Sequence, residues 1–79
     1  MNIAQRLTET FREVFNDPTL VVTPETTAKD VDGWDSFSHV NLIVAVELSF
    51  GIKFSQRELL TFRKVGDLLR SIQRNLDQA

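Results

Sequence analysis

The 79-residue sequence predicts an all-α fold, a small four-helix bundle with three main helices, one short helix and a long first loop. Apolar residues recur every three or four positions in several segments, which is the spacing of one helical face. Isoleucine and valine nowhere alternate with polar residues over the length of a strand. The length allows one domain, over residues 1–79.

The first helix is indicated by apolar residues that share one helical face: Ile3, Leu7, Phe11, Val14 and Phe15. The sequence Asn16-Asp17-Pro18 ends this helix. A loop rich in threonine, aspartate and proline then runs from Asp17 to Asp35, with Val21 and Val22 as its expected apolar anchors. Long ordered loops in small domains tend to be functional or to wrap the core. We expect Trp34 to pack the end of this loop onto the helices.

The second predicted helix, residues 36–50, is the most apolar segment of the chain. Asp35 is a good N-cap residue and Gly51 a common C-cap residue, so both of its ends are marked. At 3.6 residues per turn, the helix has two apolar faces. The expected core face carries Leu42, Ile43, Val46 and Phe50. The other face carries Phe37, Val40, Val44 and Leu48.

The third and fourth helices have equally clear signals. Ser55-Gln56-Arg57-Glu58 matches a capping box and predicts a short helix that carries Leu59, Leu60 and Phe62. The last helix has its apolar residues on one face: Val65, Leu68, Leu69, Ile72 and Leu76.

The composition excludes several kinds of site. Without cysteine, the chain has no disulfide, thiolate zinc site or cysteine nucleophile, and one histidine gives no support for a metal site. Nine basic and eleven acidic residues give a net charge of -2, without the basic excess of a nucleic-acid-binding domain. No apolar run is long enough to span a membrane, and residues 1–10 do not resemble a signal peptide. We expect a cytoplasmic monomer without a nucleic-acid partner.

Ser36 is the candidate functional residue. Because it follows an N-cap aspartate, its hydroxyl is expected at an exposed loop-to-helix junction beside free backbone N–H groups. Those donors and the helix dipole would favour a phosphate ester there. On the Asp35-Ser36 dipeptide alone, a capping serine without chemistry is the simpler interpretation. A hydrolase in which His39 activates Ser36 lacks an orienting third group, so no catalytic residue is expected.

The segment Asp35-Ser36-Phe37 resembles the Asp-Ser-Leu motif of the acyl carrier protein family, with phenylalanine in place of leucine. Phe50-Gly51-Ile52 is similar to the end of that family's second helix, and Val65-Gly66-Asp67-Leu68 to the start of its last helix. The element order, the length and the long first loop also agree. The resemblance therefore covers nearly the whole chain.

This resemblance implies a non-enzymatic carrier. A phosphopantetheinyl transferase would move 4'-phosphopantetheine from coenzyme A to Ser36, which would hold it covalently. The thiol of that arm would carry acyl groups as thioesters, which acyl-loading, acyl-transfer or synthase enzymes would attach, modify or remove.

The second helix departs from the family in its charge. Acyl carrier proteins have several glutamates on this helix, but here Glu47 is the only acidic residue in it. The apolar stripe beside Ser36 suggests a docking surface, for which the candidate recognition residues are Asp35, Phe37, Val40, Val44, Glu47 and Leu48. The alternative is that the first loop folds over this stripe and buries part of it. Because electrostatic steering would be weak, we expect a specialised fatty acid, polyketide or related pathway with its own partner enzymes.

Two other interpretations stay open. An aminoacyl or peptidyl carrier, such as a D-alanyl carrier protein, has the same arm chemistry, and Asp35-Ser36-Phe37 is similar to the D-alanyl version of the motif. From a different class, the chain could be a small non-catalytic helical interaction module.

Overall fold

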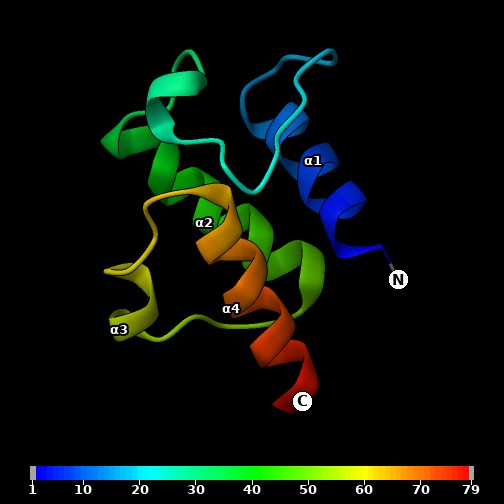
Figure 1. The fold of residues 1–79 in the computed structure, drawn as a ribbon, viewed down its shortest axis with the longest axis vertical. Helices are drawn as coiled ribbons and strands as arrows, with labels where there is room; N and C mark the ends of the chain where they lie inside the picture. Colours follow the sequence, from blue (N-terminus) through cyan, green and yellow to red (C-terminus); the bar gives the residue numbers. More distant parts are fainter. Residues whose placement is uncertain (1, 79) are drawn as a thin grey trace.

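The structure, a computed structural model, describes residues 2–78. Within this range lie four α-helices: α1 (Ile3–Val14), α2 (Ser36–Phe50), α3 (Gln56–Leu59) and α4 (Val65–Gln78). One 3₁₀ turn, η1 (Ala28–Asp30), interrupts the first loop. Residues 2–78 form no strand, so the expected all-α fold with three main helices, one short helix and a long first loop is confirmed (Figure 1).

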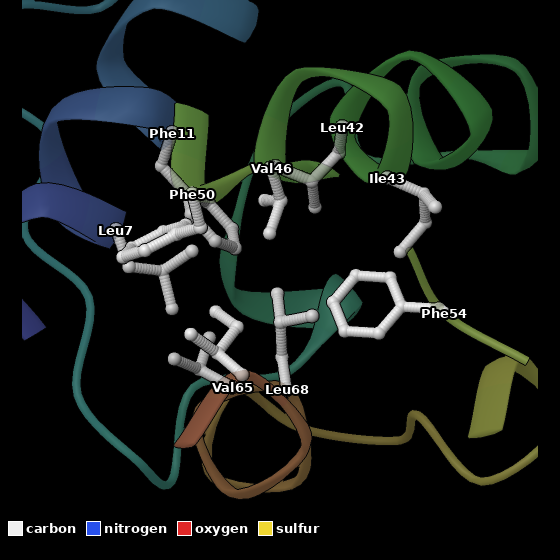
Figure 2. Close-up of a cluster of buried hydrophobic side chains, with 10 residues drawn as sticks. Leu7, Phe11, Leu42, Ile43, Val46, Phe50, Phe54, Val65 and Leu68 are labelled. Atoms are coloured by element: carbon white, nitrogen blue, oxygen red, sulfur yellow. The ribbon is translucent and has the colours of Figure 1, made fainter. Parts of the chain in front are cut away.

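The core lies between α1, α2 and α4. Figure 2 shows Leu7 and Phe11 of α1 converging with side chains of α2 onto Val65 and Leu68 of α4. The largest fully buried side chains are Phe11, Leu7, Leu42, Ile72, Val46 and Val65. Burial of one side chain of this size stabilises the fold by about 1.5–3 kcal/mol. Because several such side chains from three helices meet in one cluster, this cluster holds the domain together.

Helix α2 has the boundaries and the two faces that the sequence predicts. Its buried residues are Leu42, Ile43, Val46 and Phe50. Gly51 ends the helix in the left-handed conformation, with φ +67°, which a glycine adopts without the steric cost of a Cβ atom. The second apolar face stays exposed along its length. The alternative that the first loop covers this face is therefore wrong.

Backbone contacts fix the first loop to the start of α4. The N–H groups of Val65 and Gly66 donate to the carbonyl oxygens of Thr26 and Pro24, at 2.9 and 2.8 Å. A Cβ atom on Gly66 would lie 2.9 Å from the Pro24 oxygen, closer than such atoms approach in folded proteins. Glycine at position 66 thus allows the loop to lie directly on the helix.

The expected apolar anchors of this loop are partly wrong. Val21 is 68% exposed, whereas Val31, three residues before Trp34, is only 5% exposed. Val22 is partly buried against the core. Because an irregular loop has no fixed periodicity, the sequence does not show which of its valines points inward.

Helix α3 is a single turn. The Oγ atom of Ser55 accepts a hydrogen bond from the N–H of Glu58 at 3.2 Å, which is half of the expected capping box. The carboxylate of Glu58 instead accepts from Asn75 of α4. The prediction that this helix carries Leu60 and Phe62 is wrong, since both follow its end: Leu60 is exposed, and Phe62 packs edge-on against Phe54 with ring centroids 5.2 Å apart.

Candidate functional site

Ser36 is the first residue of α2, and its side chain is exposed. Within residues 2–78, no hydrogen bond engages its hydroxyl, in contrast to that of Ser38, two residues further along the helix. The Oγ atom of Ser38 donates to the carbonyl oxygen of Gly33 at 2.6 Å and accepts from the N–H of Asp35 at 2.8 Å. Ser38 therefore fixes the junction between loop and helix, while the hydroxyl of Ser36 stays accessible for chemistry.

Asp35 is the N-cap of α2, as expected. Its Oδ1 atom accepts hydrogen bonds from the backbone N–H groups of Phe37 and Ser38, both at 3.0 Å. The bond from the Ser38 N–H is the main reason why the pKa of the Asp35 carboxyl lies below its ordinary value, and the Ser38 hydroxyl and the Phe37 N–H add to it. Consequently this carboxylate is ionised at neutral pH.

This cap corrects one expectation about Ser36. The sequence suggested that free N–H groups of the first helical turn would be available to a phosphate ester. The carboxylate of Asp35 already occupies two of these donors, those of Phe37 and Ser38. A phosphate on Ser36 would also lie beside the negative charge of Asp35, so these two donors would not be available to stabilise it.

Trp34 packs the end of the first loop onto the helices, as expected. Its ring lies edge-on to Phe11 with centroids 5.3 Å apart and stacks on His39 at 6.0 Å. The indole Nε1–H donates to Nδ1 of His39 at 3.1 Å. Because an indole can only donate, Nδ1 carries no proton and the imidazole is neutral. Burial lowers the pKa of His39, which favours the same neutral form.

An open groove adjoins the Ser36 hydroxyl, with a volume of about 490 Å³. Its lining combines residues from three parts of the chain: Ala28, Trp34, Asp35, Ser36, His39, Phe62 and Arg63. Arg63 is the one cationic side chain in this lining, since His39 is neutral.

Sequence reasoning did not place Phe62 and Arg63 beside Ser36, because they follow α3 and are distant from it along the chain. Asp67, in the first turn of α4, fixes this segment: its Oδ2 atom accepts from the backbone N–H groups of Arg63 and Lys64 at 3.1 and 3.3 Å. The bond from the Arg63 N–H is the largest of the interactions that lower the pKa of Asp67. The one sequence signal for this arrangement is Asp67 itself. An aspartate in the first turn of a helix can accept hydrogen bonds from backbone N–H groups at the end of the preceding loop.

The apolar stripe of α2 begins at the site and runs away from it. Its four side chains, Phe37, Val40, Val44 and Leu48, are between 49% and 85% exposed. Glu47, the single acidic residue of the helix, is half-buried, and its carboxylate accepts a hydrogen bond from the N–H of Phe54 at 2.8 Å. The exposed stripe therefore presents an apolar rather than an acidic surface.

Two further kinds of site have no support in the part of the chain from residue 2 to 78. It holds no group of three or more side chains that could bind a metal ion. None of its helices has both the length and the apolar character needed to cross a membrane.

Fold and site together define a small helical bundle in which the exposed hydroxyl of Ser36 lies at the start of α2. The model of the family described as "phosphopantetheine attachment site" matches residues 5–72. The chain belongs to this family, whose cofactor is covalently bound phosphopantetheine.

A solved structure supports this assignment. The fold is similar to the solution structure of a holo acyl carrier protein from Geobacter metallireducens, with a TM-score of 0.91 and 45% sequence identity. The match covers 99% of this chain and 90% of that one. No curated protein sequence matches the chain. The acyl carrier protein family that the sequence resembles is therefore the correct one, and the fold is that of an acyl carrier protein.

Proposed function

We propose that Ser36 is the attachment point of the phosphopantetheine arm and that the protein carries acyl groups on it. The observation that supports this most directly is the exposed hydroxyl of Ser36, which has no hydrogen-bond partner within residues 2–78 and lies at the start of α2. The neighbouring Ser38 hydroxyl is held by Gly33 and Asp35. Because Ser36 is exposed, a group attached to it displaces no core side chain.

Attachment is a phosphoryl-type transfer that balances with coenzyme A as donor. The Oγ atom of Ser36 forms a bond to the phosphorus atom that bears pantetheine, while the pyrophosphate bond of coenzyme A breaks. Adenosine 3',5'-bisphosphate leaves, and the serine proton passes to a base of the transferase. His39 is not that base, because its Nδ1 atom accepts the indole N–H of Trp34. We therefore propose that this protein is a substrate of the transferase and not itself an enzyme.

The arm ends in a thiol, which holds the cargo as a thioester that partner enzymes load and remove. We propose an acyl cargo, because the 45% identical neighbour is an acyl carrier protein. An aminoacyl cargo is the second candidate, and Phe37 after Ser36 is the observation that favours it. Parallel loading of the holo protein by a fatty acyl ligase and by an amino acid adenylating enzyme separates the two. The proposal requires that the acyl thioester forms and the aminoacyl thioester does not.

We further propose that partners recognise the α2 surface through its apolar side chains, with Asp35 at its end. The stripe from Phe37 to Leu48 is exposed, and the carboxylate of Glu47 is bonded to the backbone of Phe54. A partner that fits this surface needs apolar residues rather than a basic patch, which favours a specialised pathway. Efficient loading by general fatty acid synthase enzymes would contradict this part of the proposal.

Attachment is tested by mass. The purified protein is incubated with coenzyme A and a promiscuous phosphopantetheinyl transferase, and its intact mass is compared with that of Ser36→Ala and Ser38→Ala variants. We expect one added phosphopantetheinyl group on the wild type and on Ser38→Ala, and none on Ser36→Ala. An unchanged wild-type mass would instead favour the small helical interaction module.

A further inference from the structure

The charges around Ser36 raise a question that attachment alone does not answer. A phosphodiester on Ser36 carries a negative charge directly beside the Asp35 carboxylate, which is itself ionised. That carboxylate already accepts the N–H groups of Phe37 and Ser38 at 3.0 Å, so these donors cannot also bind the phosphate. With these two donors occupied, a cation from outside the first turn of α2 would offset the charge of the phosphate.

Arg63 has the position for this role. It lines the same groove as Ser36 and is the one cationic side chain in that lining. Its side chain is exposed, and no ion pair within residues 2–78 engages it. The next residue along, Lys64, pairs with Glu25 at 3.5 Å.

The backbone of Arg63 is held while its guanidinium group is not. The N–H of Arg63 donates to Asp67 of α4 at 3.1 Å, and that of Lys64 donates to the same oxygen atom. Phe62, the residue before Arg63, is itself anchored because it packs against Phe54. A fixed backbone with an uncommitted guanidinium favours binding of a phosphate, because little loop ordering remains to oppose it and arginine can donate two parallel bonds to phosphate oxygens.

We propose that Arg63 binds the phosphodiester of the arm on Ser36 and so holds the first part of the arm in the groove between Trp34 and Phe62. This inference rests on the proposed attachment to Ser36. Arg63 is a positioning residue, since it contacts the phosphate and not the thioester end of the arm. The pair lies at the surface, so it is sensitive to salt.

The test uses the holo protein, whose modification is first confirmed by mass. The Nε–Hε signal of Arg63 is recorded in apo and holo protein by NMR, together with the ³¹P signal of the phosphodiester. We expect the Arg63 signal to shift on modification. We also expect the ³¹P signal to move as NaCl rises from about 0.1 M to about 1 M, where the screening length falls from about 10 Å to about 3 Å.

Three variants identify the cation. In Arg63→Gln at low salt, the ³¹P signal should lie where the wild type has it at high salt. Arg57→Gln, at an exposed arginine that does not line the groove, and Lys29→Gln, next to the groove residue Ala28, should retain the wild-type signal. The substitution at Arg63 leaves the fold intact, because only its backbone N–H is bonded to Asp67.

Different results would contradict the attachment to Ser36 and the binding of the phosphodiester by Arg63. A wild-type protein that gains no mass contradicts the attachment to Ser36 and with it this inference. A holo protein whose Arg63 signal equals that of the apo protein overturns the inference alone. A ³¹P shift in Lys29→Gln but not in Arg63→Gln overturns it as well, since it assigns the phosphate to another cation.

Discussion

The indole Nε1–H of Trp34 donates to Nδ1 of His39 over 3.1 Å, and the two rings stack with their centroids 6.0 Å apart. This pair joins the last turn of the first loop to the first turn of α2. It therefore determines where Ser36, which lies between the two residues, emerges from the fold. The bond requires a neutral imidazole, because a protonated Nδ1 would face the indole N–H as a second donor.

Stability should therefore depend on pH through His39. Burial lowers the pKa of His39 in the folded protein below the ordinary value of 6.5, so the unfolded chain binds the proton first as the pH falls. The contribution of neutral His39 to stability is complete above pH 6.5. It declines as the pH falls from 6.5 toward the lower pKa of the folded protein. We expect the urea midpoint of the wild type to drop between about pH 8 and about pH 5.5.

The control for this prediction is His39→Gln, which cannot titrate. Its urea midpoint should be lower than that of the wild type at the upper pH and should change less over the same range. The carboxyl groups of Asp35 and Asp67 do not interfere, since their lowered pKa values lie below this window. Equal pH dependence in the two proteins would contradict the role assigned to the Trp34–His39 pair.

The Asp35 cap should contribute to stability through its acceptor atom. Asp35→Ala leaves the N–H groups of Phe37 and Ser38 without their partner, so its urea midpoint should fall. Asp35→Asn keeps an acceptor and should lose less. Because the pKa of Asp35 is lowered by folding, its contribution is present above the ordinary value of 3.8 and is lost as the pH falls through the lowered pKa. Similar losses in the two variants at neutral pH would contradict the capping account.

Gly66→Ala should separate the first loop from α4. The added Cβ atom would lie 2.9 Å from the backbone oxygen of Pro24, so the loop has to shift. We expect a loss of about 1–3 kcal/mol in the free energy of unfolding, of which alanine's better helix propensity returns at most about 1 kcal/mol. The NMR signals of residues 24–27 should move.

Gly51→Ala is the matched variant, because a Cβ atom there meets nothing within 4 Å but residue 51 has φ +67°. It should also lose stability while the signals of residues 24–27 stay in place. Unchanged loop signals in Gly66→Ala would contradict the close approach of the two segments.

The apolar stripe of α2 should affect partner recognition and not stability. Leu48→Ser and Phe37→Ser remove exposed side chains, so unfolding should change by less than about 0.5 kcal/mol. If a partner buries them, kcat/KM for modification by a phosphopantetheinyl transferase should fall about tenfold, which corresponds to about 1.4 kcal/mol.

Leu60→Ser is the control, since Leu60 is 83% exposed, much like Phe37 at 85%, and lies outside α2. Its kcat/KM should match that of the wild type. An equal decrease in all three variants would show that the stripe is not a specific docking surface.

The sequence predicted α2 in detail because two kinds of signal, cap residues and apolar periodicity, agree there. The cap residues Asp35 and Gly51 mark its ends, and the core face of Leu42, Ile43, Val46 and Phe50 follows from helical periodicity. The groove beside Ser36 was not predictable in the same way. Phe62 and Arg63 reach it through an irregular segment after α3, where no periodicity tells which side chain faces Ser36. The cap on Asp35 was predicted, but not its consequence that the nearby donors are occupied.

The measurement that tests the central claim most directly is the position of the modification within one peptide. Trypsin cleaves after Lys29 and Lys53 and releases a fragment that contains Ser36, Ser38 and Ser49. The hydroxyl of Ser38 bonds to the backbone of Gly33, and that of Ser49 accepts from Arg6, which leaves Ser36 as the free one of the three. Fragmentation of this peptide from the holo protein should place phosphopantetheine on Ser36 alone. Its location on Ser38 or Ser49 would contradict the account.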